Sequence, residues 1–134
     1  MLNNTGIKKE KYGSGKQILF AVEHQVSMGI VVDKSVGVAD GTKKIAKAGT
    51  PITGNLDARG TAFTAAETSG GDSAPKTSNA VGILLHDVDV TVDDNNGVIL
   101  LFGFVNTNMI DATTKAKITA EVKAALPMIK FVAC

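Results

Sequence analysis

Several side chains that could do acid–base or metal chemistry lie close together in the stretch LLHDVDVTVDDNNG, residues 84–97: His86, Asp87, Asp89, Asp93 and Asp94. If this stretch is a strand, Asp87 and Asp89 point the same way, roughly 7 Å apart. That separation suits a divalent cation or a pair of carboxyl groups in acid–base catalysis. His86 would point to the opposite face, unless a bulge in the strand brings it to the carboxylates.

The same acidic residues also fit a simpler role, as the solvent side of a strand and its turn. Asp93 and Asp94 begin the turn sequence DDNNG and lack the alternating oxygen ligands and the glycine position of an EF-hand loop. We therefore prefer the solvated strand and turn. A metal-binding module that uses Asp87 and Asp89 remains the less favoured alternative.

Other residues that could support catalysis lack the necessary partners. His24 and His86 are the only histidines, and Cys134 has no histidine near it in the sequence. GSGK at 13–16 is followed by Gln17 and lacks the full phosphate-loop spacing, and no serine has the pattern of a nucleophile elbow. We predict no enzymatic activity, no catalytic residue, no metal ligand and no cofactor.

The composition is typical of one small globular domain. The chain has 134 residues, 44% of them hydrophobic and 20% charged, with a formal net charge of +1. A single cysteine excludes an intramolecular disulfide. The near-zero net charge argues against nucleic acid as a partner. No apolar run reaches the roughly 20 residues of a membrane helix, and the N-terminus lacks a secretory apolar region, so we expect a soluble protein without a membrane partner.

The chain divides into an N-terminal arm, residues 1–17, and a single β-rich domain, residues 18–134. The arm is basic and rich in glycine and asparagine, so we expect it to be flexible. In the domain, residues rich in Ile, Val and Phe predict strands at 18–23, 28–38, 79–92, 98–105 and 128–133, and a short strand within 43–54. ADGT at 39–42 predicts a turn, and the polar residues 54–79 predict a long irregular loop.

The predicted hairpin of residues 79–105 carries two further signals. Val88, Val90 and Val92 alternate with polar residues, whereas Ile83 and Leu85 have the opposite parity. Either the first half is buried on both faces, or a bulge near residues 85–87 changes the phase. Asn96–Gly97 suits a type I′ turn.

The returning strand, 98–105, is apolar on both faces. Its second face therefore needs a helix or another protein chain as cover. We take three residues as candidates for an interface between copies of the chain: Ile99, Leu101 and Val105.

One helix is expected near the C-terminus, over about 112–126. Asp111 is a suitable N-cap, Pro127 ends the helix, and Ile118, Val122 and Leu126 form an apolar stripe. The predicted fold class is mostly β (a β-rich α+β fold): a small antiparallel β domain with one short helix in its C-terminal half and a flexible N-terminal arm.

Three motifs together resemble a known family: AGTPI at 48–52, AVGILLHDVDV at 80–90 and NGVILLFGFVNTNMI at 96–110. In this order and spacing they resemble the lambda-type head decoration (capsid cement) proteins of tailed bacteriophages, and also small phage head fiber proteins. The resemblance covers roughly residues 28–133. It implies a homotrimeric, mostly β structural protein of the virion, made in the host cytoplasm.

The resemblance also implies partners. Such a trimer would sit at three-fold and quasi-three-fold positions on the outer capsid surface and bind the major capsid protein. The N-terminal arm of the family orders against the capsid, often as an added strand. By position and character this assigns capsid binding to six arm residues: Ile7, Lys8, Lys9, Lys11, Tyr12 and Lys16. An alternative is a head fiber base or host-surface adhesin, in which the loop 54–79 or the acidic hairpin contacts the host.

Overall fold

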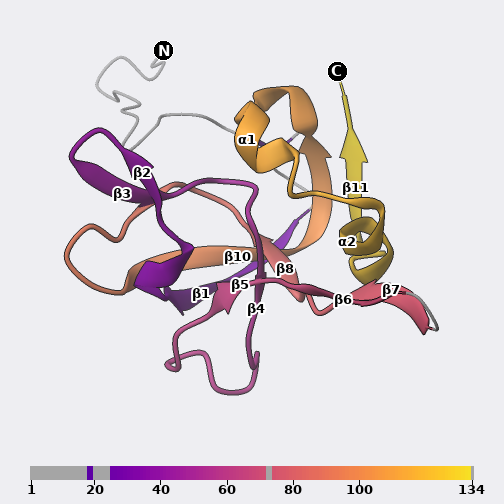
Figure 1. Cartoon of the computed structure of the whole chain (residues 1–134), viewed down its shortest axis with the longest axis horizontal. Coiled ribbons are helices and arrows are strands. Elements are labelled where there is room, and N and C mark those ends of the chain that lie inside the picture. The colour runs from indigo at the N-terminus through magenta and orange to yellow at the C-terminus, as the bar shows by residue number, and fades with distance from the viewer. Residues whose placement is uncertain (1–17, 20–24, 72–73, 134) are drawn as a thin grey trace, which may run out of the picture.

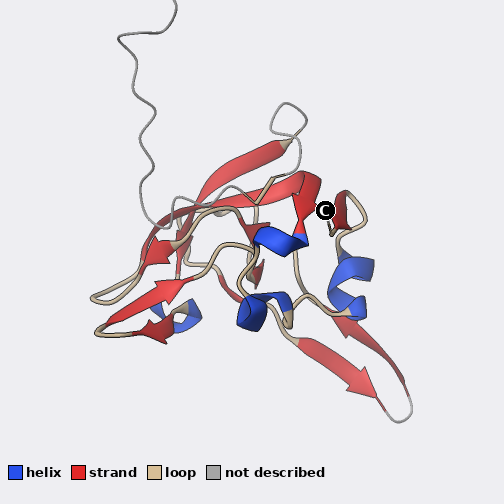
Figure 2. Ribbon diagram, turned by 90° about the horizontal axis from the view of Figure 1, so that it is seen from above, coloured by secondary structure: helices blue, strands red, loops and turns tan. Residues whose placement is uncertain are grey.

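A computed structural model describes residues 18–19, 25–71 and 74–133, and its fold is mostly β, as the sequence predicts. Figures 1 and 2 show a main sheet with two short helices beside it. Across this sheet the strands run β1 (Val26–Val32), β10 (Asn95–Asn106), β8 (Gly82–Leu84), β4 (Pro51–Thr53) and β5 (Thr64–Ala65). These neighbours are all antiparallel, and β11 (Ile129–Val132) adds to β10 in parallel.

A second sheet contains β2 (Val38–Asp40), β3 (Lys43–Ala46) and β9 (Val88–Asp89). The predicted turn at 39–42 joins β2 to β3, and Gly41 adopts the positive φ of 66° that such a tight turn favours. Two 3₁₀ turns, η1 (Lys34–Val36) and η2 (Thr107–Met109), end the strands before them. Residues 28–38, predicted as one strand, are therefore divided among β1, η1 and β2.

The segment 54–79 differs from the long loop that its polar composition predicts. It contains β5 and a separate hairpin of β6 (Thr68–Gly71) and β7 (Ala74–Ser78). The base of the hairpin is closed by the Glu67 N–H, which donates to Asn79 Oδ1 at 2.7 Å, and the Asn79 N–H, which donates to the Glu67 carbonyl at 3.1 Å. Figure 2 shows this polar hairpin projecting from the body of the molecule.

The single helix predicted over 112–126 is wrong, because the structure has two: α1 (Ala112–Lys115) and α2 (Ala120–Ala125). The predicted N-cap is confirmed, since Asp111 Oδ2 accepts from the Thr113 N–H at 3.2 Å. Thr119 interrupts the helix. Its backbone is extended, and its side chain accepts from the Val122 N–H at 3.4 Å, which starts a new helix.

The main sheet separates two clusters of buried side chains. The helix-side cluster includes Leu100 together with the predicted stripe of Ile118, Val122 and Leu126. The cluster on the other face includes Ile99 and residues of the second sheet. We call it the hairpin-side cluster, after the β2–β3 hairpin of that sheet. Adjacent residues of β8 and β10 fall in different clusters, so this part of the sheet is covered on both faces by the chain itself.

Candidate functional site

The acidic stretch contains a corner in the chain. β8 ends at Leu84, β9 begins at Val88, and the two strands belong to different sheets. The partner segment turns alongside it: β3 pairs with β9, β4 pairs with β8, and the Gly49 N–H donates to the Leu84 carbonyl at 2.6 Å between them. Residues 43–53 and 82–89 thus form one bent antiparallel ribbon that both sheets share.

The sequence offered two explanations for the change of parity here, and the structure supports the first of them, burial on both faces. Ile83 and Leu85 lie in the helix-side cluster and Leu84 in the hairpin-side cluster, so the first half is buried on both faces. The predicted bulge near residues 85–87 is wrong. The pairs Ile83–Pro51 and Val88–Ala46 are the same number of residues apart on both strands, so no residue is inserted between them. Val88 and Val90 accordingly lie in the same cluster as Leu84. His86 is exposed at this corner.

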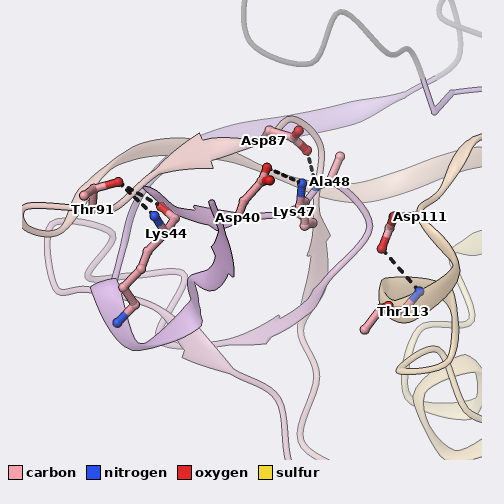
Figure 3. Close-up of polar contacts among 8 residues, drawn as sticks. All are labelled: Asp40, Lys44, Lys47, Ala48, Asp87, Thr91, Asp111 and Thr113. Atoms are coloured by element: carbon pink, nitrogen blue, oxygen red, sulfur yellow. Dashed lines mark hydrogen bonds and ion pairs between the residues drawn. The ribbon is translucent and has the colours of Figure 1, made fainter. Parts of the chain in front are cut away.

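Asp87 and Asp89, which suggested a metal site, accept hydrogen bonds from different segments of the chain. Asp87 Oδ1 accepts from the Ala48 N–H at 2.7 Å, across the corner from it (Figure 3). Asp89 Oδ1 accepts from the Thr91 hydroxyl at 2.6 Å and the Thr91 N–H at 2.9 Å, and these bonds lower the pKa of Asp89 below its ordinary value of 3.8. Among the described residues no group of three or more His, Cys, Asp or Glu side chains is placed to hold a metal ion.

The other acids, Asp93 and Asp94, line an open groove of about 480 Å³ together with Lys43 and Asp89. Asp93 and Asp94 are exposed, and Asp94 Oδ1 accepts from the Lys34 N–H at 2.8 Å. This arrangement fits the solvated turn that we preferred. Val92 shares the parity of the buried Val88 and Val90 but is 89% exposed in that turn.

The type I′ turn predicted at Asn96–Gly97 is wrong. Both residues lie within β10 and pair with Val31 and Ile30 of β1, and in the described chain no residue other than glycine has a positive φ. The chain reverses earlier, at residues 91–94, because Asn95 already begins the pairing with β1.

The structure changes the assignment of the three interface candidates. Ile99 and Val105 have no exposed surface and belong to the chain's own core, so another chain cannot reach them. Leu101 is half-buried against the hairpin-side cluster. Ile99 and Val105 are buried because the helices and the second sheet already cover the two faces of this strand.

A bulge in β10 explains why Val105 is not on the face that its parity predicts. Val26 pairs with Phe102 but Ser27 pairs with Leu100, so Leu101 has no partner on β1. Such an extra residue reverses the side on which later side chains lie. Accordingly, Leu100 and Val105 belong to the same cluster although an odd number of residues separates them.

After the bulge, one face of β10 carries an apolar surface that the chain leaves partly uncovered. Val26 is 49% exposed and lies opposite the half-buried Phe102, and Phe104, two residues further, is 39% exposed. Met128 is 60% exposed, and its carbonyl accepts from the Gly103 N–H at 3.3 Å, between the two phenylalanines. We call these four residues, Val26, Phe102, Phe104 and Met128, the apolar patch.

The six arm residues assigned to capsid binding lie outside the described residues, as does His24. The described chain begins at Ile18, whose carbonyl accepts from the Asn106 N–H at 2.8 Å, while Leu19 forms a bridge to Val105. The domain therefore begins beside the end of β10 that carries the apolar patch.

Sequence reasoning did not identify the apolar patch. Phe102 and Phe104 are two apart on a strand, which is a signal for a shared face. Val26 and Met128 come from distant segments, and only the pairing of β1 and β11 with β10 brings them there.

Comparison with known proteins gives no family assignment: no family model matches the chain, and no curated protein matches it significantly. Within the described residues, no helix has the length and apolar character needed to cross a membrane.

Proposed function

We propose that this protein is a non-enzymatic structural protein of a bacteriophage virion. It decorates and stabilises the outer surface of the capsid by binding the major capsid protein as a homotrimer at three-fold and quasi-three-fold positions. The proposal rests on the resemblance of three motifs to lambda-type head decoration proteins.

One structural observation supports this proposal. AGTPI contains the corner at Gly49 and the start of β4, AVGILLHDVDV contains β8 and the opposite side of the corner, and NGVILLFGFV lies in β10. In the main sheet β4, β8 and β10 are consecutive neighbours. The three motifs, separated in the sequence, therefore build one continuous piece of the fold, which is what a shared scaffold requires.

The physical basis of capsid binding is multivalency. Lys8, Lys9, Lys11 and Lys16 outnumber Glu10 in residues 1–17 and would favour an acidic capsid surface. An extended arm can gain main-chain hydrogen bonds from the edge of a sheet. Three arms on one trimer raise the effective concentration, so that weak single contacts give strong binding.

The apolar patch is the surface that we assign to contacts between copies in the trimer. It replaces Ile99 and Val105, which are buried in the chain's own core. Solvent-exposed apolar side chains that gather on one face are typical of protein interaction sites.

Binding to expanded capsids tests the proposal. The capsids are assembled from the major capsid protein of the same phage genome, and bound protein is measured after sedimentation. We expect saturable binding in multiples of three, and loss of binding when the four arm lysines are replaced by glutamine in the full-length chain. Equal binding by this variant and by a protein lacking residues 1–17 would remove the arm's proposed role. No binding at all would reject capsid decoration.

Two matched variants separate the role of the apolar patch from general surface hydrophobicity. Phe104→Ser removes an exposed apolar side chain from the patch, and Val92→Ser removes one from the acidic turn. We expect only Phe104→Ser to abolish the three-fold stoichiometry on the capsid. The same loss with Val92→Ser would show that the effect is not specific to the patch.

A head fiber base or adhesin is the second candidate, because the hairpin β6–β7 is polar, exposed and projecting (Figure 2). Labelled protein that binds host cells, and stops binding when residues 68–78 are replaced by a short glycine linker, would favour this function over capsid decoration.

A further inference from the structure

β1 is an edge strand without the usual protection against pairing with another chain. Its sequence, VSMGIVV, contains no charged residue and no proline. Natural edge strands are commonly blunted by such residues or covered by other elements, because an open edge invites a further strand. On one side β1 pairs with β10, and on the other only Phe63 pairs with it in the described chain.

Phe63 shows which backbone groups of β1 point to the open side. Its N–H donates to the Val31 carbonyl at 2.7 Å, and its carbonyl accepts from the Asp33 N–H at 2.9 Å. Backbone groups of alternate residues point to the same edge of a strand. The N–H and C=O of Gly29 therefore face the side on which Phe63 binds, and those of Ser27 follow where the strand continues.

Among the described residues, no segment pairs with β1 at Ser27 or Gly29, next to Phe63 along this edge. Both residues are exposed. The chain turns away before it reaches them. The Thr61 N–H donates to the Ala58 carbonyl at 3.0 Å, and the Ala58 N–H to the Asn55 carbonyl at 3.0 Å.

This turn leaves a groove of about 330 Å³ over β1 and the adjoining part of β10. Arg59 is the one charged residue in its lining: Gly29, Ile30, Val31, Arg59, Gly60, Asn96 and Gly97. Arg59 is exposed and is the only arginine in the chain. None of the described acidic residues lines this groove, so none of them is a partner for the guanidinium within it.

We propose that the free edge of β1 binds an extended segment of a partner protein that carries a carboxylate for Arg59. The segment adds to the main sheet at Ser27 and Gly29, in line with Phe63, and its main chain supplies the hydrogen bonds. A guanidinium pairs with a carboxylate in a two-pronged geometry that favours an acidic segment over a neutral one. The N-terminal arm of a second copy carries one carboxylate, Glu10, among four lysines, so it is not the acidic segment that Arg59 favours. This inference does not depend on capsid decoration.

A short capped peptide of alternating valine and threonine with one central glutamate is a suitable probe. Its binding to the full-length protein is followed by the backbone amide signals of Ser27 and Gly29 in NMR titrations. We expect these signals to shift. N-methylation of the peptide amides that face β1 should weaken binding about tenfold or more, because it removes two hydrogen bonds.

The requirement for opposite charges is tested by substitutions in the peptide and in the protein. Replacing the central glutamate by lysine, or Arg59 by alanine, should weaken binding about two- to fivefold, as expected for an exposed ion pair. Lys76→Ala removes an exposed positive charge on β7 and serves as the matched control, with unchanged binding. Equal binding of the N-methylated peptide, or no shift in β1 at millimolar peptide, would overturn the proposal.

Self-association at this edge is the competing outcome. Gly29→Pro removes the outward N–H and Gly29→Ala keeps it. If sedimentation shows the unmodified protein associating with itself, and only Gly29→Pro prevents this, the occupant is a second copy and the acidic partner is rejected. The N-methylated peptide keeps the test valid if Gly29→Pro does not fold.

Discussion

The two halves of β10 have similar apolar sequences but different surroundings. Before the bulge, Ile99 and Leu100 are fully buried on opposite faces of the sheet, and each belongs to a different cluster. After the bulge, Val105 is fully buried, whereas Phe104 on the other face is 39% exposed. A hydrophobic run along one strand therefore does not identify an interface by itself. The segments that pack on each half decide which side chains remain available to a partner.

The largest difference between the halves should be in stability. Ile99→Ala leaves a cavity between packed side chains and should lower the free energy of unfolding by about 2–5 kcal/mol. Phe104→Ala should cost less, about 1 kcal/mol, because 39% of the residue's surface is already exposed. Urea unfolding of both variants measures this. Equal losses would show that Phe104 is covered as well as Ile99 is.

Two glycines of the main sheet differ in the space next to them: Gly82 lies on the inner strand β8, and Gly29 lies on the edge strand β1. A Cβ atom on Gly82 of β8 would lie 2.5 Å from Ile99 and 2.7 Å from the Leu100 carbonyl oxygen, whereas Gly29 of β1 has open space. Gly82→Ala should therefore destabilise the protein by about 1–3 kcal/mol. Gly29→Ala is the matched control and should change stability by less than about 0.5 kcal/mol. Thermal unfolding that ranks them in the reverse order would contradict the packing described here.

Electrostatic contacts at the corner should matter less than burial. Lys47 Nζ lies 3.1 Å from Asp40 Oδ2, and this hydrogen bond raises the pKa of Lys47 above its ordinary value of 10.5. The pair therefore stabilises the fold fully below pH 10.5, and this contribution is lost as pH rises through the folded pKa. Asp40→Asn should cost at most about 1 kcal/mol near neutral pH, and the difference from the unmodified protein should shrink in alkali. A pH series of urea unfolding curves tests the sign.

The smallest expected effect is at the exposed end of the acidic stretch. The Thr91 hydroxyl and N–H hold the pKa of Asp89 below 3.8, so their contribution is present above pH 3.8 and is lost as pH falls through the folded pKa. Thr91→Val removes the hydroxyl and keeps the N–H. An NMR titration should show the pKa of Asp89 moving part of the way back. An unchanged pKa would mean that the backbone bond alone sets it.

Local patterns predicted the parts of the fold that depend on neighbouring residues. The fold class, the turn at Gly41, the N-cap at Asp111 and the stripe of Ile118, Val122 and Leu126 are all confirmed. Each depends on side chains within a few positions of one another. The burial of residues 83–85 on both faces was visible for the same reason, as apolar residues of both parities.

The features that were missed depend on pairing between distant segments. The pairing of β1 with Asn95–Gly97 displaced the predicted type I′ turn, and the unpaired Leu101 moved Val105 to the other face. A threonine is only a weak indication of a helix boundary in the sequence. In the structure Thr119 caps α2 and divides the predicted helix into two. The same holds for the candidate site. The acidic residues were visible in the sequence, but the hydrogen bond that Asp87 accepts across the corner and the apolar patch were not, because distant segments form them.

The corner ribbon has a consequence for how the molecule unfolds. Residues 43–53 and 82–89 each run through both sheets. Unfolding of one sheet therefore disrupts strand pairing in the other. The Asp87 carboxylate, which accepts from the Ala48 N–H, takes the place of a ladder bond at the bend. We therefore expect β3, β4, β8 and β9 to open as one cooperative unit, with similar rates of amide hydrogen exchange in both sheets.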